Sequence, residues 1–381
     1  MLRKSESSNP AWLYDWADPA LVVASQRAPT SGSRDPLAPL AEGCFAILRT
    51  WESGAIRMLW TPSGLSASGF LDRGRAEVRP IVSASIVPGW SKGLGTVLGL
   101  ALGALLCLVV TVAEWGAWSL VMPGRKLPAR DSTDPPGQPI EATTPDGVRL
   151  AGTWFPSEGH RVILLLHGLA EDRAALLARV PSLNRRGWSV ATLDARATGE
   201  SGGLRGSMGT READDVHAWL DALTPLAGPD PAFAAWGRSM GAASALKAAS
   251  TDFRLATLIL EAPYLDLAPT VAAVLRRLRI PGFLARLVLL RARMLAGVPL
   301  DRPRPIDLAP KVRVPLLILH GLEDPIAPIA GARTLARAFP QPAEILEVPE
   351  AGHANVVEVG GDALMDRVGD FLDRAIPARE H

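Results

Sequence analysis

An uncharged apolar stretch divides this chain of 381 residues into two parts. From Gly93 to Ala113 the sequence GLGTVLGLALGALLCLVVTVA contains no charged side chain. As a helix rising about 1.5 Å per residue, it would extend roughly 31 Å, close to the thickness of the hydrocarbon core of a bilayer. Lys92 and Glu114 bound the stretch. The aromatic residues expected at the two membrane interfaces are Trp90, Trp115 and Trp118. We therefore predict a single transmembrane helix over 93–113 rather than a buried core helix.

The basic residues on the two sides of this helix do not orient it. Three precede it and three follow it: Arg75, Arg79 and Lys92, then Arg125, Lys126 and Arg130. Because the leading 92 residues show no export signal, we expect them to remain in the cytoplasm and the C-terminal part to lie outside.

Residues 1–90 carry no spacing typical of a catalytic or metal site, and we assign them no function and no fold. The segments CFAILRTW and AIRMLW, on either side of residues 52–54, have the pattern of a β-hairpin.

Composition excludes some classes of partner. With 40 basic and 39 acidic residues the net charge is +1, so no overall field attracts nucleic acid. The two cysteines, Cys44 and Cys107, are too few for a disulfide framework or a four-ligand zinc site. We expect no nucleic-acid partner and no bound metal, and the oligomeric state stays open.

After a Pro-rich linker over 123–138, short apolar runs alternate with amphipathic segments from residue 139 to residue 376. Runs such as RVILLLHG, WSVATLDA and LATLILEAP are typical of parallel strands that are buried on both faces. The pattern predicts a doubly wound, mainly parallel α/β sheet. PIEATT and VRLAGTWF, separated by Pro145-Asp146-Gly147, predict an antiparallel hairpin before it.

The segment FAAWGRSMGAASALKAAS carries the strongest chemical signal, because a buried strand leads through Gly237-Arg238-Ser239-Met240-Gly241 into an Ala-rich helix. This is the context of a G-x-S-x-G nucleophile elbow, in which the serine lies on a strained turn and both glycines let strand and helix backbones pass closely. Ser239 is the predicted nucleophile. The alternative interpretation is a glycine-rich turn with an unreactive serine.

A serine hydroxyl needs a base, and His353 lies in a loop between the last predicted strand and the final helix. His167 and His320 each close a buried strand, where a structural role is expected. Asp324, just beyond the strand PLLILHG, is the predicted acid that orients His353; Glu323 and Asp266 are the alternatives. The oxyanion donors are predicted by position as the backbone N–H groups of Met240 and of Leu169, which follows His167-Gly168.

Residues 139–376 resemble the alpha/beta-hydrolase superfamily, with matches in chain order at HGLAEDR, DARATGES, GRSMGAAS, HGLEDPIAP and EAGH. Within it the pattern is similar to membrane-anchored, monoacylglycerol-lipase-like and acyl-aminoacyl-peptidase-like members. The resemblance implies hydrolysis of esters, thioesters or amides without a cofactor or metal. Ala197 departs from the glycine that relatives tend to carry, while Asp194, Arg196 and Ser201 are interpreted as residues that shape this loop.

Residues of about 265–310 interrupt the alternation and predict a short helical cap, broken at Ile280-Pro281-Gly282. The cap is rich in arginine: Arg276, Arg277, Arg279, Arg286, Arg291 and Arg293. It either touches the bilayer and admits a lipid-like ester, or is a solvated basic face.

The sequence thus predicts a serine hydrolase that acts on an acyl ester beside a membrane bilayer. A thioesterase or a peptidase would use the same triad, and a catalytically silent membrane scaffold is the alternative from another class.

Overall fold

The computed structural model describes residues 21–24, 46–49, 56–61, 64–69, 94–122, 124 and 135–379. The chain forms two compact units, residues 1–103 and residues 104–381, and the division falls within helix α4 (Leu94–Val121). Trp90, Lys92 and most of the predicted linker lie outside the described residues.

The described residues of the first unit include two pairs of short strands. β1 (Leu21–Ala24) pairs in parallel with β2 (Ala46–Arg49), and β3 (Ile56–Thr61) pairs antiparallel with β4 (Gly64–Gly69). The hairpin expected between residues 46–49 and 56–60 is therefore wrong, because these two segments belong to different sheets. The hairpin lies one strand later, where Thr61 is opposite Gly64.

Helix α4 contains the predicted apolar segment, and residues Gly99–Val121 are long and apolar enough to cross a membrane by length and composition. The helix does not end at Ala113 but continues to Val121. Large apolar side chains along its first part are exposed, among them Leu102, Leu106 and Leu108.

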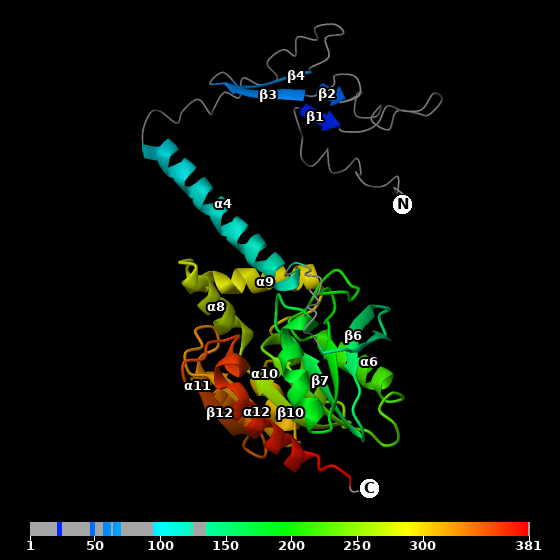
Figure 1. The fold of residues 1–381 in the computed structure, drawn as a ribbon. Helices are drawn as coiled ribbons and strands as arrows, with labels where there is room; N and C mark the ends of the chain where they lie inside the picture. The colour runs from blue at the N-terminus through cyan, green and yellow to red at the C-terminus, as the bar shows by residue number, and fades with distance from the viewer. Residues whose placement is uncertain are drawn as a thin grey trace, which may run out of the picture. The chain divides into compact units, whose positions relative to one another are not determined.

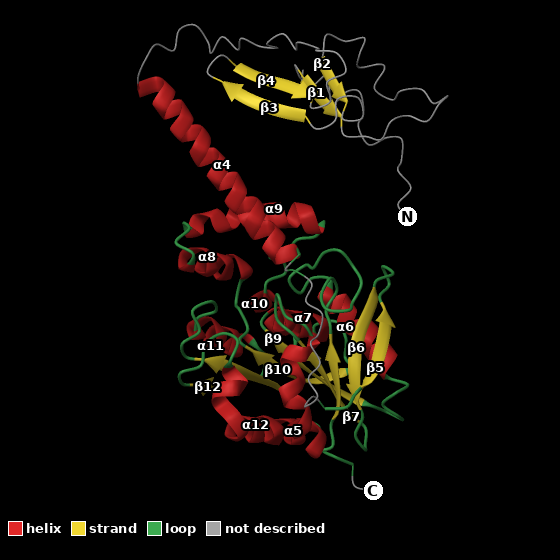
Figure 2. Ribbon diagram, turned by 45° about the horizontal axis from the view of Figure 1, so that its top comes forward, coloured by secondary structure: helices red, strands yellow, loops and turns green. Residues whose placement is uncertain are grey.

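The second unit is built on a sheet with strand order β12-β11-β10-β9-β7-β8-β6-β5 (Figures 1 and 2). Its strands are β5 (Gln138–Thr143), β6 (Arg149–Phe155), β7 (Arg161–Leu166), β8 (Ser189–Leu193), β9 (Ala232–Arg238), β10 (Leu255–Glu261), β11 (Leu316–Gly321) and β12 (Glu344–Val348). The six neighbouring strands β8, β7, β9, β10, β11 and β12 pair in parallel. Strand β6 is antiparallel to both of its neighbours, β8 and β5. This confirms the α/β prediction and the leading hairpin.

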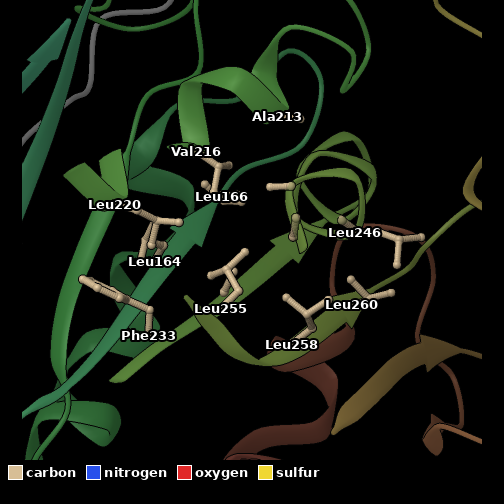
Figure 3. Packing of buried hydrophobic residues seen from close by; sticks show 14 of the residues in the cluster. Leu164, Leu166, Ala213, Val216, Leu220, Phe233, Leu246, Leu255, Leu258 and Leu260 are labelled. Carbon is tan, nitrogen blue, oxygen red and sulfur yellow. The ribbon is translucent and has the colours of Figure 1, made fainter. Parts of the chain in front are cut away.

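Helices cover both faces of this sheet, which explains the continuous apolar runs of the strands. In β7, Leu164 and Leu166 belong to one core, whereas Ile163 and Leu165 belong to the other. The first core packs against helices α6 (Glu212–Leu223), α7 (Met240–Ala249), α10 (Pro305–Leu308) and α11 (Ile329–Ala338). Figure 3 shows Val216 and Leu220 of α6 and Leu246 of α7 among the strand leucines of this core.

The second core packs against three helical segments: η1 (Arg173–Arg179), α5 (Val180–Arg185) and α12 (Val356–Ala375, interrupted at Gly361). At the carboxyl ends of the parallel strands, the segment predicted as a cap forms α8 (Leu267–Arg277), η2 (Gly282–Leu284) and α9 (Ala285–Ala296).

These cap helices share a third apolar core with the end of α4. It includes Val112, Ala117 and Val121 of α4, Val288 of α9, and Met240, the residue after the predicted nucleophile.

Candidate active site

Ser239 lies between the last residue of β9 and the first residue of α7, in a backbone conformation with φ +52° and ψ −108°. Such a conformation is strained for a residue other than glycine. The neighbouring glycines are required by space. A Cβ at Gly237 would lie 2.2 Å from the carbonyl oxygen of Gly241, and one at Gly241 would lie 2.2 Å from that of Leu166. The turn therefore has the strand-to-helix geometry expected from the sequence.

The structure brings Ser239, His353 and Asp324 together from three separate segments. His353, in the loop between β12 and α12, has Nε2 2.9 Å from Oγ of Ser239. Its Nδ1 lies 2.7 Å from Oδ2 of Asp324, which follows β11. Both distances are within hydrogen-bonding range, so one imidazole connects the hydroxyl to the carboxylate.

The Asp324 carboxylate is held in place by the backbone. Its Oδ1 accepts hydrogen bonds from the N–H groups of Ile326 at 2.8 Å and Ala327 at 2.9 Å, which leaves Oδ2 for His353. Burial acts to raise the pKa of Asp324. The hydrogen bond from His353, the charge of the His353 imidazolium and the two backbone N–H groups together outweigh burial and lower this pKa. The carboxyl group is therefore ionised at neutral pH and can stabilise an imidazolium.

The other histidines and acids that were considered as catalytic residues make different contacts. His167 Nε2 accepts a hydrogen bond from the N–H of Ala195 at 3.1 Å, and His320 Nε2 lies 2.7 Å from the carbonyl oxygen of Ala327. Asp266 caps α8 by accepting from the N–H of Ala268 at 3.0 Å, and the side chain of Glu323 is exposed. Neither alternative acid replaces Asp324 beside His353.

The two predicted oxyanion donors come from the elbow and from the loop after β7. Met240 is the first residue of α7, where backbone N–H groups have no partner within the helix and the helix dipole favours negative charge. Leu169 follows β7 and lines the same cavity as Ser239. The N–H of Gly168 donates to Oε2 of Glu171 at 2.7 Å, so this neighbouring N–H is already paired.

Sequence reasoning missed an ion pair that connects three loops of this site. Arg238, 4% exposed, lies with its guanidinium 2.7 Å from Glu171, and it donates to the carbonyl oxygen of Ala354 at 3.3 Å. Burial acts to lower the pKa of Arg238, but Glu261 and Glu171 raise it overall, so it stays charged. The signal available in the sequence was an arginine inside the elbow motif, where a buried charge requires a partner.

The loop after β8 is organised by the residues that were predicted to shape it. The carboxylate of Asp194 accepts from the N–H groups of Arg173 at 2.8 Å and Glu200 at 2.9 Å, and Ser201 Oγ donates to the carbonyl oxygen of Asp194 at 2.8 Å. Arg196 is buried and pairs with Asp215 and Asp146.

Ala197 in the same loop has φ +63°, which is in the left-handed region. Glycine adopts this conformation at a lower energetic cost than alanine does.

A cavity of about 240 Å³ lies over Ser239 and His353. Its walls are mostly apolar and come from α4, α8 and α9, together with the loops after β7 and β11. Among the described residues, no group of three or more His, Cys, Asp or Glu side chains could hold a metal ion.

The elbow, the assembled Ser–His–Asp geometry and the doubly wound sheet together define a hydrolase class. Residues 157–305 match the family model described as serine aminopeptidase, S33, and residues 290–380 match the model described as TAP-like protein. The chain belongs to the alpha/beta-hydrolase superfamily, and the family match indicates a hydrolase.

Several individual proteins are similar to this chain. An uncharacterized protein of Mycobacterium tuberculosis is 30% identical over 250 residues, which are 65% of this chain and 83% of the relative. Human protein ABHD12B is 31% identical over 198 residues, 48% of this chain and 51% of that protein. The esterase Pf2001 of Pyrococcus furiosus has a similar fold, with a TM-score of 0.55 and 22% identity, over 66% of this chain and 98% of the esterase.

Proposed function

We propose that this protein is a membrane-anchored serine hydrolase that cleaves a carboxylic ester through an acyl-Ser239 intermediate. The observation that supports this most strongly is the connected pair of contacts at His353, 2.9 Å to Ser239 and 2.7 Å to Asp324. The strained φ of Ser239 and the apolar cavity over its hydroxyl add to it.

In the first half of the reaction, His353 Nε2 takes the hydroxyl proton while Ser239 Oγ bonds to the ester carbonyl carbon. The carbonyl oxygen becomes an oxyanion that the N–H groups of Met240 and Leu169 stabilise. When the carbon–oxygen bond to the alcohol breaks, His353 gives its proton to the departing alkoxide, which leaves an acyl-serine.

In the second half, His353 takes a proton from water, and the hydroxide bonds to the acyl carbon. Collapse of this second oxyanion breaks the bond to Ser239, whose oxygen regains the proton from His353. Asp324 stays ionised throughout and stabilises the imidazolium.

The charges of the cavity favour an apolar acyl group over a peptide with a free amino terminus. An aminopeptidase must hold an ammonium group, which requires an available carboxylate. Glu171 is the one acidic side chain among the residues that line this cavity, and it is already paired with Arg238 at 2.7 Å. We therefore propose an ester substrate, with thioesters and peptides as competing substrates for the assay.

The anchoring part of the proposal rests on Gly99–Val121, which is long and apolar enough to cross a membrane, and on the exposed leucines of its first part, Leu102, Leu106 and Leu108. We propose that the cap also contacts the bilayer, because α9 exposes apolar side chains beside arginines. Those side chains are Leu287, Leu290 and Met294 beside Arg286 and Arg293. Placement of the catalytic domain outside the cytoplasm is tested by proteolysis: protection of the domain in intact cells and digestion only after lysis would contradict it.

The experiment that tests the function is labelling of the full chain in detergent by a fluorophosphonate, which reacts with activated serines. The full chain is used because α4 lines the cavity. Labelling should be lost in Ser239→Ala and His353→Ala. It should persist in the control variants Ser250→Ala, at the far end of α7, and His217→Ala, on α6.

Absence of labelling in the folded full chain would instead favour the binding scaffold. If labelling occurs, matched butyryl esters, butyryl thioesters and aminoacyl amides then compare the three substrate classes. We expect the ester to have the highest kcat/KM, and faster cleavage of the amide would contradict the proposal.

A further inference from the structure

The last two turns of α4 are part of the hydrolase unit, not only of the membrane segment. Ala117 and Val121 have no exposed surface, and they pack in the same apolar cluster as Val288 and Ala292 of α9. The same helix exposes Leu106 and Leu108 two to three turns earlier. One continuous helix therefore changes from an exposed apolar rod to a buried element of the catalytic domain.

Specific contacts fix this end of the helix. A Cβ on Gly116 would lie 2.9 Å from Cγ1 of Val288, so the two helices approach each other about as closely as a glycine allows. Glu114 pairs with Arg291 of α9, and the carbonyl oxygen of Val121 accepts from the N–H of Gly206 at 2.7 Å. Figures 1 and 2 show the end of α4 against α9.

Another part of this segment faces the cavity over Ser239. The α4 residues that line it are Trp115, Gly116, Ser119 and Leu120. The cap residues that line it are Leu267, Val271, Val274, Leu275 and Val288. The helix that is long enough to cross the membrane thus contributes directly to the wall of the candidate active site.

The cavity also reaches the surface beside this helix. Trp115 and Val274 both line the cavity, yet they are 49% and 36% exposed. An apolar chain bound at Ser239 can therefore extend between α4 and α8 to the apolar surface of the anchor. At about 240 Å³, the cavity lies below the range of about 300–1,000 Å³ common for drug-sized ligands, which favours one acyl chain over a two-chain lipid.

We propose that Trp115, Ser119 and Leu120 of α4 form the acyl-chain wall of the active site, and that this wall selects esters of a single fatty acyl chain. This inference rests on the proposed esterase function. In this proposal the helix that anchors the protein also determines its substrate specificity.

The test compares the full chain and its variants in the same detergent, with p-nitrophenyl butyrate and p-nitrophenyl dodecanoate. Leu120→Trp places bulk in the wall and should lower the ratio of kcat/KM for the dodecanoate to that for the butyrate by tenfold or more. Leu120→Ala enlarges the cavity beside this wall and should raise the same ratio. Leu106→Trp, on the exposed part of the same helix, is the matched control and should keep the ratio of the unaltered chain.

The outcomes separate this inference from the proposed function. Equal ratios in Leu120→Trp, Leu106→Trp and the unaltered chain, with Ser239 still labelled by a fluorophosphonate, would overturn the wall and leave the esterase standing. No labelling of the unaltered chain would remove the esterase itself.

A second measurement needs no variant and covers the case in which Leu120→Trp does not fold. An alkyl fluorophosphonate with a diazirine at the end of a twelve-carbon chain is attached to Ser239 of the unaltered full chain and then irradiated. We expect cross-links within residues 115–120. Cross-links that occur in α8 or α9 but never in α4 would overturn the proposal.

Discussion

The side chains of Arg238 and Glu171 form an ion pair of 2.7 Å that connects the nucleophile elbow to the loop bearing Leu169. Glu171 Oε2 also accepts the N–H of Gly168, so its position affects the peptide that precedes the proposed second oxyanion donor. The pair thereby couples the segment that carries the nucleophile to the segment that would stabilise the oxyanion.

Glu171→Gln should therefore lower kcat/KM through a lower kcat, with little change in substrate binding. The amide keeps the size of the side chain but removes the charge that faces Arg238, and displacement of one oxyanion donor should cost about tenfold, less than the 10²–10³ for outright loss of such a donor. Steady-state kinetics with p-nitrophenyl butyrate measure this, and the loss should lie in kcat. Glu141→Gln, which breaks the exposed pair with Arg149, should leave kcat within twofold. Equal effects of the two variants would argue against a positioning role for Glu171.

Asp324→Asn should lower kcat by about 10²–10⁴, because an amide no longer holds the tautomer of His353 that places a lone pair at Nε2. Rates of p-nitrophenyl butyrate hydrolysis at saturating ester provide the measurement. Fluorophosphonate labelling should slow in parallel. A variant that retains more than half of the kcat would remove Asp324 from the proposed mechanism.

The same substitution gives a pH test of stability. The folded-state pKa of Asp324 is lowered, so its ionised form stabilises the folded chain above the unfolded pKa of about 3.9, and this contribution is lost as pH falls through the folded value. The difference between the melting temperatures of the unaltered chain and Asp324→Asn should therefore stay constant from pH 6 to about pH 4 and shrink as pH falls from about 4 toward 2. A difference that stays constant down to about pH 2 would contradict the lowered pKa.

Ala197→Gly should stabilise the protein by about 0.5–1 kcal/mol. Alanine at φ +63° costs about 1–2 kcal/mol, and the greater freedom of glycine in the unfolded chain cancels part of the gain. Thermal unfolding in detergent checks this. The control Ala222→Gly, in the last turn of helix α6, should change stability in the opposite direction, by up to about 1 kcal/mol.

The cap arginines give a prediction about the lipid surface. Arg286→Glu with Arg293→Glu should lower the specific activity of the full chain in nanodiscs that contain anionic lipid, because both arginines are exposed on α9 beside apolar side chains. In zwitterionic nanodiscs, or at about 0.5 M salt, the difference should disappear. The same activity of both chains in anionic nanodiscs would favour a solvated basic face instead.

The parts of this fold that could be predicted are those with a local signal. The buried strands are short apolar runs, most of them rich in Val, Leu and Ile. The elbow needs glycine at 237 and 241 for steric reasons that the Cβ distances reproduce. His353 and Asp324 could be proposed because each follows a strand at the end of the sheet where Ser239 was expected.

Features that depend on distant partners could not be predicted. The apolar stretch was expected to end before Glu114 because a charge opposes continuation into a membrane. In the structure that charge is paired with Arg291, 177 residues away, and the helix continues to Val121. The role of Arg238 was missed for the same reason, since Glu171 and Ala354 approach it only in the folded chain.

Another feature with no local signal in the sequence is the ion pair of Arg179 and Glu261, whose side chains are both fully buried. Arg179 donates to both carboxylate oxygens at 2.8 Å, and Trp236 Nε1 donates to the same carboxylate at 2.9 Å. The backbone carbonyl of Glu261 accepts the N–H of Ser239 at 2.8 Å, so the residue that holds Arg179 is also bonded to the nucleophile's backbone.

Arg179→Met should destabilise the protein by about 3 kcal/mol, because the buried Glu261 carboxylate loses its bidentate partner and keeps only the more distant guanidinium of Arg238 at 3.9 Å. The double variant Arg179→Met with Glu261→Leu removes both charges and should recover most of that loss, since a buried pair costs nearly as much in desolvation as it returns in attraction. Unfolding free energies of the two single variants and the double variant form a cycle that measures the coupling. Additive losses would show that the two side chains do not depend on each other, which their bidentate contact argues against.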